Sequence, residues 1–272
     1  MPELPEVETI ARELNGHVTG RRIEAIEIFR ADALGRQAPA DFCRALRGRE
    51  IRHCSRRGKY LIFHLHPERY LVVHLRMTGK FAVTAPLEAP LRDHRLWFHL
   101  DDGRVLVFQD LRCFGTLDVV ARLSDSPALS KLGMEPLSPQ CTQSWLRRAL
   151  AASRTPLKPW LMDQTKIAGL GNIYASEILY AAGLDPTQPA NGLDGPSVAR
   201  LHRATRRILR KAILKSGTTI SDFRRVDQKT GEFQHFLRVY GKAGEPCPKC
   251  KTPIAAIRQQ QRSTFFCPQC QR

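Results

Sequence analysis

The first hydrophobic pattern along the chain has the period of an α-helix. Its apolar positions are three or four residues apart and are Leu4, Val7, Ile10, Leu14 and Val18. This spacing predicts an amphipathic helix that ends near Gly16. Proline is accepted in the first turn of a helix, and acidic side chains there complement the helix dipole. Pro2, Glu3 and Glu6 are therefore explained as a helix start by the local pattern alone.

Between about residue 20 and residue 120 the pattern changes to short apolar segments separated by polar turns. The clearest predicted strands are residues 22–28, 60–65, 70–75, 96–100 and 105–108. Asp102-Gly103 lies between the last two, and this dipeptide is typical of a tight β-hairpin. Several short strands at near-regular intervals predict a β-sandwich or barrel with the N-terminal helix packed on it.

The pattern becomes helical after a Ser- and Pro-rich stretch at residues 124–139, which we interpret as a linker region. The predicted helices are residues 145–152, 172–182 and 198–215, and Gly183 stops the second of them. Residues 217–235 are polar, have no clear period and are predicted to form a loop. The expected domains are residues 1–125, a linker at 126–137, a helical domain at 138–236 and a terminal module at 237–272.

Composition and charge narrow the class of partner. The chain has 272 residues, 42% of them hydrophobic, which allows one large or two ordinary domains plus a small module. Its 43 Lys and Arg exceed its 26 Asp and Glu by 17 charges, and this excess favours a polyanion, above all nucleic acid. An anionic membrane is the alternative, but no apolar run reaches the roughly 18 residues that span a bilayer, and the acidic start is unlike a signal peptide. We therefore expect a cytoplasmic, nucleoid-associated protein.

Positive charge is concentrated on the predicted helix at residues 198–215. Its cationic side chains are Arg203, Arg206, Arg207, Arg210 and Lys211. Such a run is often a solvated helix face, whereas the single sign of its charge favours contact with phosphate. Both interpretations stay open at the level of the sequence.

The eight cysteines fall into two sets. Four are scattered singly, as expected of reduced thiols, and are Cys43, Cys54, Cys113 and Cys141. The other four form two Cys-Pro-x-Cys knuckles and are Cys247, Cys250, Cys267 and Cys270. The spacing C-x2-C-x16-C-x2-C supplies four thiolates for a closed tetrahedral zinc site without an open position for water. One structural zinc ion would replace the core that a module of about 35 residues cannot build.

Residues 254–258 and 263–266 lie between the knuckles and are predicted to pair as a hairpin with residues 259–262 at its tip. Arg262 would then be either a phosphate contact on a rigid tip or an ordinary solvated residue. The segment Lys166-Ile-Ala-Gly-Leu-Gly-Asn172 leads into a helix start, where backbone N–H groups can approach phosphate. It matches neither the Walker nor the GxGxxG pattern, so it favours nucleic-acid backbone contact over a nucleotide cofactor.

The start of the chain also offers a nucleophile. If Met1 is removed, Pro2 carries a free secondary amine, and such an amine has a pKa of about 8, so a fraction is neutral at pH 7. Condensation of this amine with an aldehyde carbon gives a cationic imine, which acts as an electron sink. Glu3 and Glu6 would supply carboxylates for proton transfer.

Seven blocks, in order from the first residue to the last, share a family pattern. They are Met1-Pro-Glu-Leu-Pro-Glu-Val-Glu, Arg56-Arg-Gly-Lys59-Tyr, His74-Leu-Arg-Met77-Thr-Gly, Asp110-Leu-Arg112-Cys-Phe114-Gly, Lys158-Pro-Trp-Leu-Met-Asp, Gly169-Leu-Gly-Asn172-Ile-Tyr-Ala-Ser-Glu and Gln261-Arg262-Ser-Thr-Phe-Phe-Cys-Pro-Gln-Cys. Together they resemble the bacterial formamidopyrimidine-DNA glycosylases of the formamidopyrimidine-DNA glycosylase and endonuclease VIII family. The endonuclease VIII branch usually has Gly at position 4, so Leu4 favours the branch that acts on purine lesions.

The resemblance implies an α+β protein with three parts. These are an N-terminal β-sandwich with a packed N-terminal helix, a C-terminal helical domain of the helix-two-turns-helix type, and a zinc-ribbon hairpin. It also implies a monomer that binds damaged duplex DNA, with one structural zinc ion, no nucleotide cofactor and no membrane partner.

Roles for single residues follow from the same resemblance. Pro2 would attack C1′ of the damaged nucleotide with Glu3 as acid and base, Lys59 would assist β-elimination, and Arg262 would serve phosphate binding and δ-elimination. The substrate-binding set would be Glu6, which holds the extruded base and sugar, and Thr218, Thr219 and Ser221 of a loop that closes over the base. The DNA-binding set would be Met77, His94, Arg112, Phe114, Arg154, Lys158, Asn172 and Tyr240. Met77, Arg112 and Phe114 would fill the gap left by the flipped nucleotide.

Three positions depart from the family pattern. His94 is displaced by one place from the usual histidine, Cys113 stands where a basic residue is common, and Lys251 stands where Gly commonly follows the knuckle. The resemblance nevertheless implies a bifunctional glycosylase and abasic-site lyase that removes oxidised purines such as 8-oxoguanine and formamidopyrimidines and cuts the strand by β,δ-elimination. The alternatives are an oxidised-pyrimidine glycosylase of the endonuclease VIII type and a non-catalytic zinc-ribbon protein that binds nucleic acid.

Overall fold

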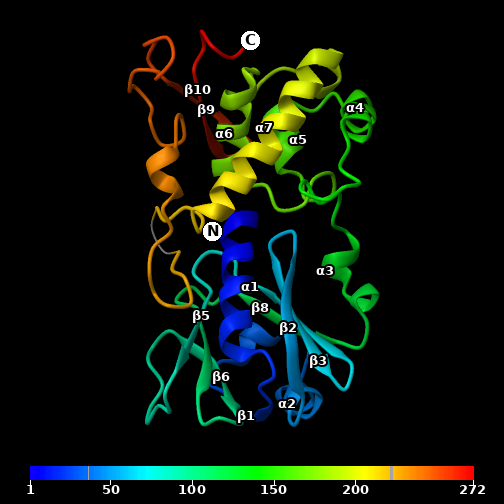
Figure 1. The fold of residues 1–272 in the computed structure, drawn as a ribbon, viewed down its shortest axis with the longest axis vertical. Helices are drawn as coiled ribbons and strands as arrows, with labels where there is room; N and C mark the ends of the chain where they lie inside the picture. Colours follow the sequence, from blue (N-terminus) through cyan, green and yellow to red (C-terminus); the bar gives the residue numbers. More distant parts are fainter. Residues whose placement is uncertain (36, 221–222) are drawn as a thin grey trace. The chain divides into compact units, whose positions relative to one another are not determined.

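The computed structural model describes residues 1–35, 37–220 and 223–272, and the chain divides into two compact units (Figure 1). Unit 1 comprises Met1–Ser130 and Lys215–Glu232, and unit 2 comprises Lys131–Leu214 and Phe233–Arg272. Of the predicted polar loop at 217–235, the part up to Glu232 therefore belongs to the N-terminal unit, although it follows the last long helix in the chain. Residues 233–235 belong to unit 2 and lie in the 3-10 turn Phe233–Phe236. The boundaries 125/126, 137/138 and 236/237 stay predictions.

The N-terminal helix of unit 1, α1, runs from Leu4 to Val18. The apolar positions that predicted it are all buried, so one face of the helix packs into the core of the unit. The predicted end near Gly16 is two residues early. Val18 is fully buried, and its burial keeps the chain helical beyond Gly16 to the extended cap at Thr19.

Two four-stranded antiparallel sheets form the rest of the core of unit 1. One has the order β1-β6-β7-β5, with β1 at Ile23–Ile28, β6 at His94–Leu100, β7 at Val105–Gln109 and β5 at Lys80–Thr84. The other has the order β2-β3-β4-β8, with β2 at Glu50–Arg57, β3 at Tyr60–His66, β4 at Arg69–His74 and β8 at Thr116–Val120. One hydrophobic cluster contains residues of both sheets, for example Phe63 and Phe81, whose ring centroids are 5.5 Å apart. The predicted sandwich is confirmed.

Several elements of unit 1 were not predicted. They are β2, β5, β8, the helices α2 at Pro39–Leu46 and α3 at Pro127–Ser130, and the 3-10 turns at Ala31–Leu34 and Leu123–Asp125. Strand β2 is polar except for Ile51 and Cys54, so it carries almost no alternation. Helix α2 buries only Phe42 and Leu46, which is too few apolar positions for a helical period.

Unit 2 is helical, as predicted. It contains α4 at Gln143–Ala151, α5 at Leu157–Met162, α6 at Asn172–Ala182 and α7 at Gly195–Leu214, with 3-10 turns at Ala190–Gly192 and Phe233–Phe236. Gly183 ends α6 in the left-handed conformation with φ of 67°, which glycine adopts without a steric penalty. A two-stranded hairpin of β9, Ala255–Gln259, and β10, Arg262–Phe266, completes the unit. Within the described ranges no helix combines the length and the apolar character needed to cross a membrane.

Candidate functional site

The start of the chain lies inside unit 1 rather than on a frayed end. Pro2 is buried, and Glu3 and Glu6 are only 3% and 2% exposed. The backbone N–H of Glu3 donates to Oε2 of Glu6 at 2.8 Å, which is half of a capping box at the first turn of α1. The first turn therefore brings two buried carboxylates beside the residue that would carry the amine.

Contacts between α1 and β2 bring Lys59 to the end of unit 1 that contains the first turn of α1. The side chain of Asn15 binds both backbone groups of Cys54, with distances of 2.8 Å to the carbonyl oxygen and 2.6 Å from the N–H. Seven residues earlier in the helix, Glu8 accepts a hydrogen bond from Nε of Arg56 at 3.1 Å. A helix rises about 1.5 Å per residue and a strand about 3.3 Å, so the turn that follows β2 reaches the first turn of α1. Lys59 lies in this turn and is 5% exposed.

The segment 215–232 is held on α1 by two carboxylates. Oε1 of Glu6 accepts a hydrogen bond from the backbone N–H of Thr218 at 2.7 Å. Two turns further along the helix, Glu13 accepts from the backbone N–H of Val226 at 2.9 Å and pairs with Arg225. Val226 is buried in the core of unit 1. Of the predicted substrate-binding loop, Thr218 therefore lies beside Glu6, whereas the hydroxyl of Thr219 donates to the carbonyl of Phe223 at 3.3 Å and accepts from the N–H of Gly231 at 2.9 Å. Ser221 lies outside the described residues.

Gly217 is the residue that allows this close approach. Its φ is +76°, and a Cβ at this position would lie 2.8 Å from Oε1 of Glu6. We expect Gly217→Ala to lower the free energy of unfolding of unit 1 by about 1–3 kcal/mol more than Gly48→Ala does. Gly48 is the matched control in the same unit, because its φ is +77° but a Cβ there meets nothing within 4 Å. Denaturant titration of both variants measures the difference, and equal losses would contradict the contact.

The predicted gap-filling residues form an exposed apolar and cationic surface. Met77 is 37% exposed and Phe114 is 54% exposed, and the guanidinium of Arg112 lies 5.0 Å from the ring centroid of Phe114. Thr78, next to Met77, accepts a hydrogen bond from the backbone N–H of Arg112 at 3.0 Å. The structure thus brings together two segments that are more than thirty residues apart in the sequence.

Asp110 organises this surface and was not assigned a role from the sequence. It is 1% exposed, and its carboxylate accepts hydrogen bonds from the hydroxyl of Thr78 and from the backbone N–H of Gly115 and Arg112. Its backbone carbonyl accepts from Nε of Arg95 at 2.6 Å. The only sequence signal was its position at the start of the block that also contains Arg112 and Phe114.

His74 supports the same turn in its neutral form. Its Nδ1 accepts a hydrogen bond from the backbone N–H of Arg76 at 2.9 Å, and the ring packs edge-on against Tyr60 with centroids 4.5 Å apart. Burial, together with the nearby charges of Arg76 and Lys59, lowers the pKa of His74 to about 3. The ring therefore stays unprotonated in the folded protein at any pH near neutrality.

This lowered pKa predicts a loss of stability in acid. Between the unfolded pKa of about 6.5 and the folded pKa, the unfolded chain binds a proton at His74 and the folded chain does not. Stability is therefore complete above the unfolded pKa and falls as the pH decreases toward the folded one. Relative to His74→Asn, whose side chain can accept the same hydrogen bond without titrating, the wild type should lose about 2 kcal/mol between pH 7 and pH 5. Urea titrations at the two pH values test this, and parallel pH profiles of the two proteins would refute it.

His94 is used inside the protein. It is 4% exposed, its Nδ1 accepts from Nε1 of Trp97 at 2.8 Å, and its Nε2 lies 3.0 Å from Nε2 of Gln109. Both ring nitrogens are therefore engaged by neighbouring side chains of the same sheet. A contact of His94 with DNA stays a prediction.

In unit 2 the predicted DNA-binding residues have different environments. Arg154 is exposed, Asn172 is the first residue of α6, and Tyr240 is half-buried. Lys158 is only 1% exposed, and its Nζ donates to the carbonyl of Ser263 at 2.9 Å and to the hydroxyl of Thr264 at 2.7 Å. Lys158 thus anchors β10 in this structure, and its direct contact with phosphate stays a prediction.

The four knuckle cysteines come together as the spacing predicted. Their Sγ atoms all lie within 4.8 Å of one another, with 3.9 Å between Cys247 and Cys270 and 3.4 Å between Cys250 and Cys267. Four thiolates bound tetrahedrally to zinc at about 2.3 Å would be separated by about 3.8 Å, so the cluster fits this ion. The phenol oxygen of Tyr180 lies 3.4 Å from Sγ of Cys247, within hydrogen-bond distance, and would help to orient this zinc ligand without binding the metal itself. The metal site is closed by four sulfurs and is therefore structural.

Arg262 lies next to the hairpin tip rather than within it. It is the first residue of β10 and pairs with Gln259, so the turn consists of Gln260 and Gln261 alone. Both turn residues have positive φ, 46° and 61°, as a two-residue hairpin turn of type I′ requires. Arg262 is exposed on this short hairpin. Lys158 binds the hairpin at Thr264, two residues after Arg262.

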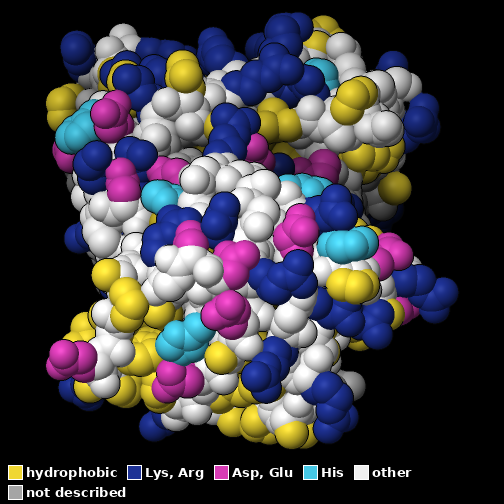
Figure 2. All heavy atoms as spheres, turned by 60° about the horizontal axis from the view of Figure 1, so that its bottom comes forward, with side chains coloured by type: hydrophobic (Ala, Val, Ile, Leu, Met, Phe, Trp, Pro, Cys, Tyr) yellow, Lys and Arg dark blue, Asp and Glu magenta, His cyan; other side chains and the backbone are white. Residues whose placement is uncertain are grey.

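The surface charge agrees with a polyanionic partner. Lys and Arg side chains outnumber Asp and Glu on the face drawn in Figure 2, in keeping with the net charge of +17.

Glu177 is the second important residue that the sequence did not reveal. This carboxylate is 1% exposed and accepts hydrogen bonds from three successive backbone N–H groups, those of Arg238, Val239 and Tyr240, at 2.9–3.0 Å.

Comparison with known families covers nearly the whole chain. Residues 1–117 match the formamidopyrimidine-DNA glycosylase N-terminal domain, residues 132–224 match the formamidopyrimidine-DNA glycosylase H2TH domain, and residues 244–272 match the zinc finger found in FPG and IleRS.

Individual proteins show the same similarity. The chain is 44% identical to the formamidopyrimidine-DNA glycosylase of Symbiobacterium thermophilum, over all of this chain and 89% of the relative, and 43% identical to that of Laribacter hongkongensis over the full length of both. Its structure resembles a Lactococcus lactis FPG mutant in complex with Fapy-dG-containing DNA, with a TM-score of 0.93 and 37% identity over both full chains. It also resembles MutM (FPG) from Thermus thermophilus, with a TM-score of 0.89 and 39% identity over 99% and 98% of the two chains.

Proposed function

Since the chain belongs to the formamidopyrimidine-DNA glycosylase family, we propose that it excises oxidised purines from duplex DNA with the amine of Pro2 as nucleophile. The observation that carries this proposal is the first turn of α1, where Pro2 precedes two buried carboxylates, one of which also binds the loop at Thr218. A helix start without catalysis needs neither carboxylate to be buried.

The reaction follows from the chemistry of a secondary amine. The nitrogen of Pro2 attacks C1′ of the damaged nucleotide, and the bond between C1′ and the base breaks as the base leaves with a proton. The product is a cationic imine between Pro2 and the opened sugar. This imine acidifies C2′, so loss of a proton there expels the 3′ phosphate, and a second elimination expels the 5′ phosphate.

Glu3 and Lys59 are the proposed proton carriers. Glu3 is the nearer of the two carboxylates to Pro2 in the sequence and would protonate the sugar ring oxygen as it opens and later remove protons. Lys59 lies in the turn after β2, at the same end of unit 1, and would assist the first elimination. Glu6, held by the N–H groups of Glu3 and Thr218, would orient the extruded base and sugar.

DNA contact is assigned to residues of both units. Met77, Arg112 and Phe114 would enter the duplex, where apolar wedges unstack bases and a guanidinium can pair with the orphaned base. Arg154, Asn172, Tyr240 and Arg262 would bind phosphates, with His94 and Lys158 as the two less accessible members of the predicted set. Zinc would be held by the four cysteines and would serve the hairpin without taking part in the chemistry. The protein would act as a monomer on chromosomal DNA, in a cytoplasmic, nucleoid-associated location.

Trapping with borohydride tests the proposal. Borohydride reduces the imine, so incubation with a duplex that contains 8-oxoguanine or formamidopyrimidine should give a covalent protein–DNA adduct. Parallel reactions with duplexes that contain oxidised pyrimidines distinguish the purine-lesion branch of the family from the endonuclease VIII branch. We expect the purine lesions to react faster, because Leu4 is typical of the purine-lesion branch. If lesion-bearing duplex binds but no adduct forms with any lesion, the protein is a binding module and the catalytic proposal fails.

A further inference from the structure

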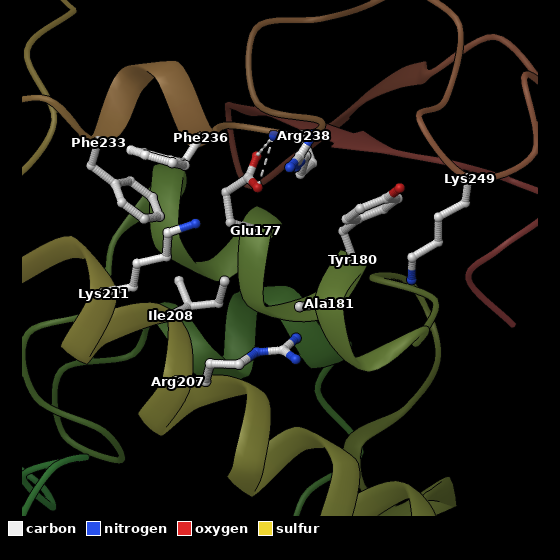
Figure 3. A pocket seen from close by; sticks show the side chains of 10 residues that line it. All are labelled: Glu177, Tyr180, Ala181, Arg207, Ile208, Lys211, Phe233, Phe236, Arg238 and Lys249. Carbon is white, nitrogen blue, oxygen red and sulfur yellow. Dashed lines mark hydrogen bonds between the residues drawn. The ribbon is translucent and has the colours of Figure 1, made fainter. Parts of the chain in front are cut away.

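A cavity of about 340 Å³ in unit 2 is lined by none of the proposed catalytic, DNA-binding or zinc-binding residues (Figure 3). It lies between α6, α7 and the turn Phe233–Phe236. Its apolar wall is formed by Tyr180, Ile208, Phe233 and Phe236. The rings of Phe233 and Phe236 are 6.0 Å apart, and Phe233 also packs on Tyr174, so this wall is continuous with the core of the unit. Its volume suits a single apolar side chain or a small ring.

Four cations surround this apolar wall. Nζ of Lys211 lies 3.8 Å from the ring centroid of Phe236, and Nζ of Lys249 lies 4.8 Å from that of Tyr180. Arg207 and Arg238 complete the set, and all four side chains are exposed. Among the described residues, no carboxylate forms an ion pair with Arg207, Lys211 or Lys249. The one carboxylate that lines the cavity, Glu177, is already bound by three backbone N–H groups.

A second hollow of about 370 Å³ continues the first one along α7. The two share Ala181 and Arg207, and the second adds Arg200 and Arg203. Arg200, Arg203, Arg207 and Lys211 are three or four residues apart and thus lie on one helix face. From Arg200 to Lys211 this face extends for about 16 Å, which about five residues of an extended chain would span. The result is a basic groove with an apolar pocket at one end.

We propose that this groove binds an acidic peptide segment of a partner protein, with consecutive carboxylates along α7 and a bulky apolar or aromatic residue in the end pocket. Charge complementarity selects an anion, since every ionised side chain exposed along the groove is cationic. The concave shape of the groove argues against duplex DNA as its ligand. The phosphates of a duplex lie on a convex, rigid surface, and a duplex has no apolar group that could fill the pocket. An extended peptide satisfies both requirements.

Fluorescence anisotropy with a defined probe tests this proposal. The probe is Asp-Asp-Asp-Asp-Phe with a free C-terminal carboxylate and a fluorophore on its N-terminus, at about 0.15 M salt. We expect saturable binding that weakens about tenfold when the Phe of the probe is replaced by Ala. Arg207→Ala should weaken binding by about the same factor, and Arg147→Ala by less than about twofold. Arg147 is the matched control because it is exposed on α4 of the same unit but does not line these hollows or the third one beside Arg207.

Three outcomes overturn the proposal. If Arg207→Ala and Arg147→Ala weaken binding equally, or if the Ala probe binds as well as the Phe probe, the attraction is diffuse charge without a site. If a five-nucleotide single strand displaces the peptide with equal affinity, the groove is a nucleic-acid surface. Phe236→Ala provides a second variant at the pocket end, and its thermal unfolding is recorded to show that unit 2 is folded. Borohydride trapping reports on Pro2 independently, so failure here leaves the proposed function unaffected.

Discussion

A chain with one extra residue before Pro2 is expected to give no covalent adduct with lesion-bearing duplex after borohydride treatment. Only a free secondary amine can form the imine, and acylation of the nitrogen converts it into an amide without nucleophilic character. Retention of Met1 has the same effect as an added residue, so the mature protein must begin at Pro2. Mass spectrometry of the intact protein checks this condition directly.

Two comparisons make this first prediction specific. Pro2→Gly retains a primary amine but loses the ring, and should reduce adduct formation strongly without abolishing it. Glu3→Gln retains the amine and the helix start, and should slow base release by about 10²- to 10⁴-fold, the range typical of a lost general acid or base. The extended chain should still bind the duplex, because the exposed surface at Met77 and Phe114 and the zinc hairpin are unchanged. Full activity in a protein that retains Met1 would exclude Pro2 as nucleophile.

Cys250→Ser is expected to abolish zinc retention and, with it, binding to lesion-bearing duplex. The hairpin of unit 2 has little core of its own beyond Val239, Ile254 and the cysteines, so the metal supplies most of the free energy that folds it. Arg262 is the first residue of β10, and collapse of the hairpin would remove its guanidinium from any fixed position. Zinc released on denaturation, measured with a metal indicator, should fall from one equivalent to none.

Cys43→Ser is the matched control for this second prediction. Cys43 lies on α2 of unit 1, is a free thiol and is not a member of the zinc cluster. That variant should keep one zinc ion and normal DNA binding. Unchanged DNA binding by Cys250→Ser would show that the hairpin is dispensable for recognition and would remove Arg262 from the proposed site.

The residues that sequence reasoning did not identify share one property. Asp110 and Glu177 are carboxylates at 1% exposure, and each accepts hydrogen bonds from a segment distant in the sequence: Asp110 from the hydroxyl of Thr78, and Glu177 from the backbone N–H groups of residues 238–240. Nothing in the local sequence of a charged residue distinguishes such a position from a solvated one. Burial of a charge is tolerated only where several hydrogen bonds replace water, and those partners are assembled by the fold.

The sequence by itself determined the parts of this protein that depend on short-range order. These are the amphipathic helix α1, the hairpin at Asp102-Gly103, the end of α6 at Gly183 and the four zinc ligands, because helical period, turn chemistry and ligand spacing act over a few residues. Only the tertiary structure decided that the polar segment 215–232 is held on α1 by Glu6 and Glu13, and that Lys158 anchors the hairpin that carries Arg262. Those contacts join residues more than a hundred positions apart, and their free energy comes from groups that are paired only after the chain has folded.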